Sequence, residues 1–166
     1  IDKKKIYVCE RSSTHILYQK DLLWDEYKSL NLNLELLKLK EKGFRDWMIE
    51  GEIKEYELAN YILVPSSFVE RSFKKYNFTK TIVVEFGVNL ENFHPIKEIK
   101  KDNKYFDILF IGQLSVQKGL HYLIKAFHQF KHPNKRLHIV GGITNDKNFF
   151  SNQLKDDNIF VYGHIN

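Results

Sequence analysis

With 166 residues, 43% of them hydrophobic and 14% aromatic, the chain can build a core for one ordinary domain or two small ones. It contains no run of about 18 apolar residues and no signal-peptide pattern at its start, so we expect a cytoplasmic protein without a membrane span. A net charge of +5 favours anionic partners such as nucleotides, nucleic acid or an acidic lipid surface, although 21 acidic residues are spread among the 26 basic ones. Cys9 is the only cysteine, which excludes an internal disulfide and a cysteine-based zinc site.

The first half of the chain alternates short apolar runs with amphipathic stretches. Apolar residues that recur every three or four positions predict helices, and short apolar runs bounded by turn residues predict buried strands. The predicted elements are a strand at 5–10, a helix with Ile16, Leu23, Tyr27 and Leu30 on one face, a short helix within 31–44, a helix over 45–60, and strands at 61–64 and 81–85.

A further helix between the last two of these strands carries its own start and stop signals. Ser67, followed three residues later by Glu70, is typical of a capping box, so the predicted helix runs from about Phe68 to Tyr76. Asn77 is its predicted stop.

The pattern restarts after a lysine-rich linker at 97–104, which lacks the interleaved aromatic residues of a nucleic-acid platform. Strands alternating with helices imply an α/β fold with parallel sheets covered on both faces, and the linker suggests two lobes. The elements predicted after the linker are a strand at 107–112, a helix over 118–131 with Leu120, Leu123, Ile124, Phe127 and Phe130 facing inward, a strand at 136–141, a weaker helix at 147–155 and a strand at 158–163.

The loop after the strand at 107–112 is the first candidate site, because ligands of doubly wound sheets bind at the carboxyl ends of the strands. Lys118 and Gly119 open the next predicted helix there. A cation at a helix N-terminus is unfavourable by roughly a few tenths of a kcal/mol. Lys118 therefore indicates one of two arrangements. Either it binds an anion that the helix dipole also attracts, or its side chain reaches into water.

Arg11 and His15 follow the first predicted strand, where a catalytic base or a substrate contact belongs in such a sheet. They could equally cap the helix that begins there. The residues themselves leave both readings open.

Longer motifs point to a family. The segments "FIGQLSVQKGLHYLIKAF", "LHIVGG" and "IFVYGHI" resemble the start of the C-terminal lobe of family 4 glycosyltransferases, the retaining nucleotide-sugar enzymes of the GT-B fold. Upstream, "EYELANYILVPSSFVERSF" and "TIVVEFGVNLENFHP" resemble the end of the N-terminal lobe of these enzymes. "CERSSTHILYQKDLLWDEY" is similar to an acceptor-side segment in one bacterial branch.

The resemblance implies how a donor would be held. Lys118 matches the loop lysine that contacts the donor diphosphate, and Gly112, Gln113 and Gly119 lie beside it in the same motif. The family often carries an arginine where Gln113 stands, and glutamine can donate a hydrogen bond but brings no charge.

The resemblance also implies the remaining partners. Gly163 and His164 match the loop that borders the nucleotide base, while Arg11 and His15 lie in the segment that faces the acceptor and are the candidate catalytic residues. The expected reaction moves a hexose from a nucleotide-diphosphate sugar to a glycan or lipid-linked acceptor with retention. It needs no metal or cofactor and no nucleic acid, and it takes place in the cytoplasm or at the inner membrane face.

The implied fold is a partial GT-B fold, α/β, with two Rossmann-like half-lobes that contain parallel sheets. Residues 1–95 match the second half of the N-terminal, acceptor-side lobe, and residues 96–166 match the first half of the C-terminal, donor lobe. The paired glutamates of the family would lie beyond Asn166, so we expect this chain alone not to transfer sugar. We also expect bare half-lobe surfaces to favour self-association. The alternative is a non-catalytic nucleotide- or phosphate-binding α/β module.

Overall fold

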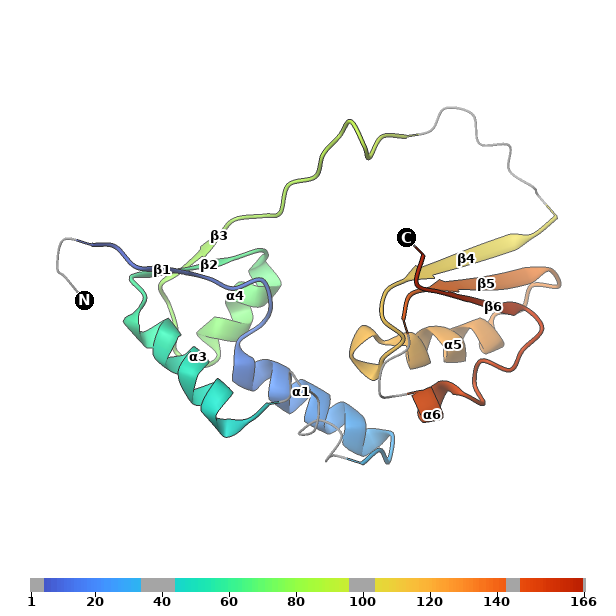
Figure 1. The fold of residues 1–166 in the computed structure, drawn as a ribbon, viewed down its shortest axis with the longest axis horizontal. Coiled ribbons are helices and arrows are strands. Elements are labelled where there is room, and N and C mark those ends of the chain that lie inside the picture. The colour runs from blue at the N-terminus through green and yellow to red at the C-terminus, as the bar shows by residue number, and fades with distance from the viewer. Residues whose placement is uncertain (1–4, 34–43, 96–103, 143–146, 166) are drawn as a thin grey trace. The chain divides into compact units, whose positions relative to one another are not determined.

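The computed structural model describes residues 5–33, 44–95, 104–142 and 147–165. The chain divides into two compact units, Ile1–Pro95 and Ile96–Asn166 (Figure 1). Each unit contains one three-stranded parallel sheet with its strands in chain order, β1–β2–β3 in the first and β4–β5–β6 in the second. Most of the predicted linker at 97–104 and most of the predicted short helix within 31–44 lie outside the described residues.

The elements of the first unit follow the predicted order. The strand β2 has the predicted bounds, and because it contains only four residues it limits the length of both strands that pair with it. The outer strands are therefore shorter than predicted. The elements are β1 (Val8–Glu10), α1 (Ile16–Ser29), α3 (Asp46–Leu58), β2 (Tyr61–Val64), α4 (Ser67–Lys74) and β3 (Thr81–Val83).

The start of α4 differs from the prediction by one residue. Ser66, not Ser67, is the N-cap, and its hydroxyl accepts a hydrogen bond from the backbone N–H of Val69 at 3.3 Å. Glu70 does not complete the predicted capping box, because its carboxylate contacts Lys74 at 2.9 Å. Two adjacent serines satisfy the sequence rule equally well, and the extended backbone of Ser66 decides between them. The predicted stop is confirmed, since Asn77 has a left-handed backbone with φ of 66°.

The core of the first unit lies between the sheet and its helices. Within the cluster between sheet and helices Tyr56 and Phe73 are the largest fully buried side chains, and Ile62 and Val64 are the inward residues of β2; Tyr27 of α1 is fully buried as well. Its buried members are Cys9, Ile16, Ile49, Tyr56, Ala59, Ile62, Val64, Val69 and Phe73.

The second unit also keeps the predicted order of strands and helices. Its main difference from the prediction lies at the start of the long helix, where a separate 3₁₀ turn precedes α5. The elements are β4 (Phe106–Ile111), η1 (Val116–Lys118), α5 (Leu120–Gln129), β5 (Lys135–Val140), α6 (Lys147–Phe150) and β6 (Ile159–Gly163). Leu120, Ile124 and Phe127 of α5 pack on Leu137 and Ile139 of β5 to form the core.

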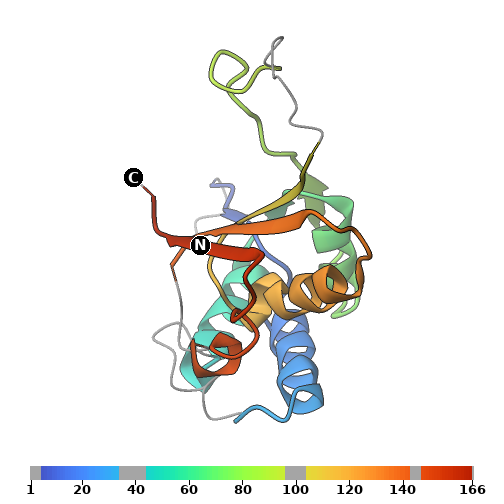
Figure 2. The ribbon, with the colours of Figure 1, turned by 90° about the vertical axis from the view of Figure 1, so that its right-hand side faces the viewer.

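Each sheet is covered by helices on one face only among the described residues, so the prediction of two covered faces is wrong. In the second unit, α5 and α6 lie on the same side of the strands (Figure 2). On the opposite face Leu109 and Ile111 are 61% and 74% exposed. In the first unit Val8 and Tyr61 are 43% and 46% exposed.

The strand order explains this one-sided arrangement. Crossovers between parallel strands are right-handed, so strands added in one direction along a sheet place every crossover helix on the same face. Helices reach the second face only where the strand order reverses, and neither three-stranded sheet contains a reversal.

Candidate functional site

Three glycines line the carboxyl edge of the second unit's sheet. Gly112 follows β4, Gly141 follows β5 and Gly163 ends β6, and all three have positive φ angles, of 154°, 145° and 70°. Backbone hydrogen bonds connect them: the N–H of Gly112 donates to Val140 at 2.9 Å, and the N–H of Gly141 donates to Gly163 at 2.7 Å. The loops after the three strands therefore form one continuous edge.

Gly141 is required at this edge by a close approach of two backbones. A Cβ placed on it would lie 1.9 Å from the carbonyl oxygen of Gly112, a distance that no side chain can occupy. Sequence reasoning did not select Gly141. Its signal was the double glycine that ends the segment "LHIVGG".

The loop between β4 and α5 is anchored by buried side chains and presents polar ones. Leu114, Ser115 and Val116 are buried, whereas Gln113 and Lys118 are exposed. The N–H of Leu114 donates to the carbonyl of Gly142 at 2.9 Å, which attaches the loop to the edge described above. The loop is thus held from within while its polar residues face outward.

Lys118 does not lie in the first turn of α5, as the predicted helix over 118–131 required. It is the last residue of η1, and Gly119 then adopts a left-handed conformation, with φ of 70°, before α5 begins at Leu120. Glycine adopts this conformation without steric cost, so it can separate the two helical segments. Lys118 lies directly before α5 and forms no ion pair with a described residue.

The structure brings the candidate donor residues onto one edge of one sheet. Gly112 and Gly163 are both held beside Gly141 as described, and Gln113 directly follows Gly112. His164 follows Gly163 and is exposed.

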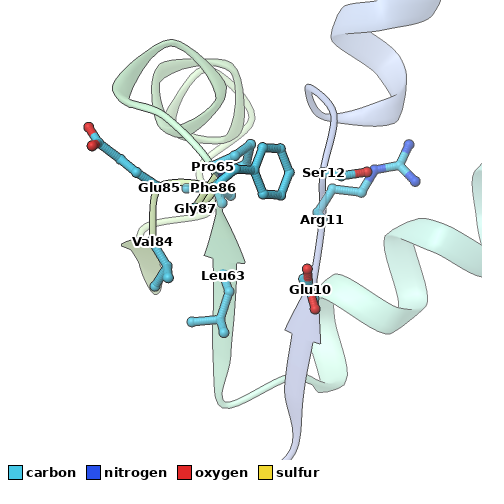
Figure 3. Close-up of a pocket in the computed structure, with 10 residues that line it drawn as sticks. Glu10, Arg11, Ser12, Leu63, Pro65, Val84, Glu85, Phe86 and Gly87 are labelled. Carbon is cyan, nitrogen blue, oxygen red and sulfur yellow. The ribbon is translucent and has the colours of Figure 1, made fainter. Parts of the chain in front are cut away.

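The carboxyl edge of the first unit's sheet contains a pocket of about 230 Å³. Figure 3 shows the Arg11 guanidinium pointing away from Pro65, Phe86 and Gly87, and the Glu85 carboxylate pointing away on the other side. The pocket wall is mainly apolar at its centre. Its lining residues are Glu10, Arg11, Ser12, Leu63, Val64, Pro65, Val84, Glu85, Phe86 and Gly87.

Arg11 lines this pocket but is already paired. One guanidinium nitrogen, Nη2, lies 2.8 Å from Oε2 of Glu52, and the hydroxyl of Tyr56 donates to the same oxygen at 2.6 Å. Burial, followed by the hydrogen bond to Glu52, raises the pKa of Tyr56. The Nε atom of Arg11 is buried and has no hydrogen-bond partner among the described residues.

His15 does not line the pocket. It is fully buried and caps α1, where its Nδ1 accepts a hydrogen bond from the N–H of Leu17 at 3.3 Å. Its ring stacks on Tyr76 with 4.4 Å between ring centroids. Burial, and secondarily the charge of Arg11, lower the pKa of His15 to about 4.

Arg11 and His15, for which the sequence left a site role and a helix-capping role open, therefore occupy different positions. His15 is the helix cap, and the geometry gives it no exposed atom with which to reach an acceptor. Arg11 is at the pocket, and its backbone N–H donates to Leu63 at 2.9 Å. Glu52, which pairs with Arg11, and Tyr56, which donates to Glu52, were missed because they lie on α3, far along the sequence from β1.

Neither a metal cluster nor a membrane helix is found in the ranges that the structure describes. No three His, Cys, Asp or Glu side chains there gather closely enough to hold a metal ion. No helix in those ranges is long and apolar enough to cross a bilayer.

Comparison with known proteins gives two matches. Residues 92–166 match the family model for glycosyl transferases group 1. The chain is also similar to the UDP-N-acetylglucosamine--N-acetylmuramyl-(pentapeptide) pyrophosphoryl-undecaprenol N-acetylglucosamine transferase of Borrelia hermsii (strain HS1 / DAH), with 31% identity over 98 residues. The aligned region is 59% of this chain and 26% of the relative, so the chain spans about a quarter of that protein's length.

Both matches are to proteins described as sugar transferases. The two three-stranded parallel sheets confirm the predicted α/β fold class, and together with the family match over residues 92–166 they are consistent with two Rossmann-like half-lobes of a GT-B fold.

Proposed function

We propose that this chain carries the central part of a family 4 retaining glycosyltransferase, which moves a hexose from a nucleotide-diphosphate sugar to a glycan or lipid-linked acceptor. In this proposal Ile1–Pro95 supplies the second half of the acceptor-side lobe and Ile96–Asn166 supplies the first half of the donor lobe. The observation that carries the proposal is the glycine-lined edge after β4, β5 and β6, with Lys118 on the loop that leaves it, a cation that forms no ion pair with the residues that the structure describes.

The donor diphosphate would lie at the β4–α5 loop. Glycines let phosphate oxygens approach the backbone, and the N-terminal end of α5 favours a negative charge. Lys118 adds a full charge, and Gln113 adds a hydrogen-bond donor in place of a second charge. The nucleotide base would lie at the neighbouring loop of Gly163 and His164.

The acceptor would lie at the pocket of the first unit, and Arg11, which lines the pocket, would contact its charged part by turning from Glu52 toward the pocket. The name of the Borrelia relative includes a pyrophosphoryl-undecaprenol, which supports a lipid-linked diphosphate as the acceptor class. Arg11 retains its proposed catalytic role at this pocket. His15 would act through position only, because it holds the start of α1 beside Arg11. With this acceptor class we expect the enzyme to act in the cytoplasm, at the inner face of the membrane.

The proposal can be tested at Lys118. Lys118→Ala should weaken the binding of a nucleotide-diphosphate sugar by about 1.5 to 3 kcal/mol, the size of a charge-assisted hydrogen bond, without changing thermal stability. Isothermal titration with UDP, GDP and ADP sugars measures this effect. Lys125→Ala, which removes an exposed lysine from the middle of α5, is the matched control and should leave affinity unchanged. Equal affinities for the two variants would disprove the diphosphate site.

Retention is tested separately, on the protein as its gene encodes it. The anomeric coupling in the proton NMR spectrum of the product distinguishes retention from inversion. Donor binding without any transfer would favour the non-catalytic nucleotide-binding module instead.

Self-association is the last part of the proposal. Leu109, Ile111 and Tyr162 on the uncovered face of the second sheet are all more than half exposed, and apolar surface of this kind favours a protein partner. Light scattering across a dilution series should show a concentration-dependent mass, and a constant monomer mass would contradict it.

A further inference from the structure

The outer face of α4 combines an aromatic ring with two cations. Phe68, Arg71 and Lys75 follow each other at spacings of three and four residues, so they share one side of the helix. The buried residues Val69 and Phe73 occupy the opposite side. Phe68 is 49% exposed, and both cations are exposed.

Tyr18 of α1 extends this face onto a second helix. Its ring lies edge-on to that of Phe68, with 6.1 Å between centroids. The Lys75 ammonium lies 5.2 Å from the centre of the Tyr18 ring, and the Arg71 guanidinium carbon lies 5.8 Å from the centre of the Phe68 ring. We call Tyr18, Phe68, Arg71 and Lys75 the cation–aromatic patch.

The cations of the patch are not neutralised by neighbouring acids. Glu70, the only acid within α4, pairs with Lys74, which lies outside the patch. Arg71 and Lys75 form no ion pair with any residue that the structure describes. Asp21 of α1 accepts a hydrogen bond from the Tyr76 hydroxyl at 2.9 Å.

From these contacts we propose that the cation–aromatic patch binds the surface of an anionic lipid bilayer. The inference rests on the proposed function, because a lipid-linked acceptor is reached at a membrane. Aromatic rings with polar or charged neighbours favour the interface between headgroups and acyl chains, and unpaired cations are attracted to anionic headgroups. Long cationic side chains can place their charge in the headgroup layer while their stems stay with the rings.

A nucleic acid fits the patch less well. Nucleic-acid bases bind to proteins by stacking on free aromatic faces, and here Arg71 and Lys75 lie over the rings of Phe68 and Tyr18. A phosphate backbone would also require a row of cations, whereas this patch offers two.

The test is co-sedimentation with vesicles of phosphatidylcholine that contain phosphatidylglycerol, compared with vesicles of phosphatidylcholine alone. We expect binding to the anionic vesicles that weakens as salt is raised. The double variant Arg71→Glu, Lys75→Glu should lower the partition coefficient at least about tenfold, since each cation near an anionic surface contributes roughly fivefold. Phe68→Ser, which changes no charge, should also lower it.

The matched control is Lys125→Glu, Lys131→Glu, which changes the net charge equally on exposed residues of the second unit. Equal losses in the two double variants would overturn the proposal, because they would show a response to net charge alone. Equal binding to neutral and anionic vesicles would also overturn the proposal. A dimer that dissociates only in the patch variant would overturn it too, because the patch would then bind a second copy of the chain. Circular dichroism checks that each variant is folded. Titration with a nucleotide sugar separates this proposal from the proposed function. If the patch variant loses vesicle binding but keeps its donor affinity, the result supports the patch. If the unchanged protein binds the donor but no vesicles, the result refutes the patch and leaves the proposed function standing.

Discussion

At the scale of single residues, Gly141 is the most constrained position of the candidate donor edge. Gly141→Ala would place a methyl group 1.9 Å from the carbonyl oxygen of Gly112 on a backbone with φ of 145°. The two loops would have to separate, so we expect a loss of roughly 1 to 3 kcal/mol or more in the free energy of unfolding. Urea denaturation followed by circular dichroism measures it.

Two glycines serve as controls for this substitution. Gly142→Ala should be nearly neutral, because a Cβ there meets nothing within 4 Å and no positive φ is required. Gly51→Ala lies in the exposed interior of α3 and should stabilise the first unit by about 0.5 to 1 kcal/mol. A Gly141→Ala variant as stable as Gly142→Ala would contradict the close approach of the two backbones.

His15 should make the stability of the first unit depend on pH. Its pKa is about 4 in the folded chain and about 6.5 in an unfolded chain, so folding favours the neutral ring. Its contribution is complete above the unfolded pKa and is lost as the pH falls from about 6.5 towards 4, because the unfolded chain binds the proton first. The free energy of unfolding should fall by up to about 1.4 kcal/mol per pH unit in this window.

His15→Asn isolates this effect, since asparagine can still accept the capping hydrogen bond but does not titrate. Urea titrations of both proteins at several pH values give the difference in slope. Parallel slopes for the two proteins would show that His15 is not responsible.

Part of the candidate site follows from sequence rules alone. The placement of Gln113 and Gly163 at one sheet edge follows from strand prediction and the parallel arrangement, because Gln113 lies in the loop directly after β4 and Gly163 ends β6. The contact between Gly112 and Gly141 does not, since it depends on the register of β4 against β5. The pairing of Arg11 with Glu52 likewise depends on how α3 packs beside β1, which no local pattern encodes.

At the scale of elements, the N-cap of α4 separates two adjacent serines. Ser66→Ala removes the side-chain acceptor for the N–H of Val69 and should cost about 0.5 to 2 kcal/mol of stability. Ser67→Ala, one residue later, removes only a long contact to Arg71 at 3.5 Å and should be close to neutral. Thermal unfolding of the two variants is the measurement, and a larger loss for Ser67→Ala would restore the capping box predicted from the sequence.

The elements that were predicted well are those with strong periodicity and clear ends. β2 is an apolar run closed by proline and was found with its observed bounds. The start of α5 was missed because its apolar period continues back to Val116, and only the left-handed conformation of Gly119 interrupts the helix. A glycine permits that conformation but does not require it.

At the scale of the whole molecule, the sequence correctly indicated parallel α/β sheets but not which faces are covered. Alternating strands and helices are compatible with one or two covered faces. The direction in which strands are added decides between them, and that direction depends on long-range pairing.

The division into two units also has a spectroscopic consequence. Both tryptophans of the chain, Trp24 and Trp47, belong to Ile1–Pro95, so selectively excited tryptophan emission reports on that unit alone. Far-ultraviolet circular dichroism records the helices and strands of both units. Because each unit has its own core, we expect the emission and dichroism curves in urea to have different midpoints, which two-state unfolding does not allow. Superimposable curves would mean that the two units unfold as one cooperative body. If the curves differ, the emission curve gives the stability of the first unit without dividing the chain.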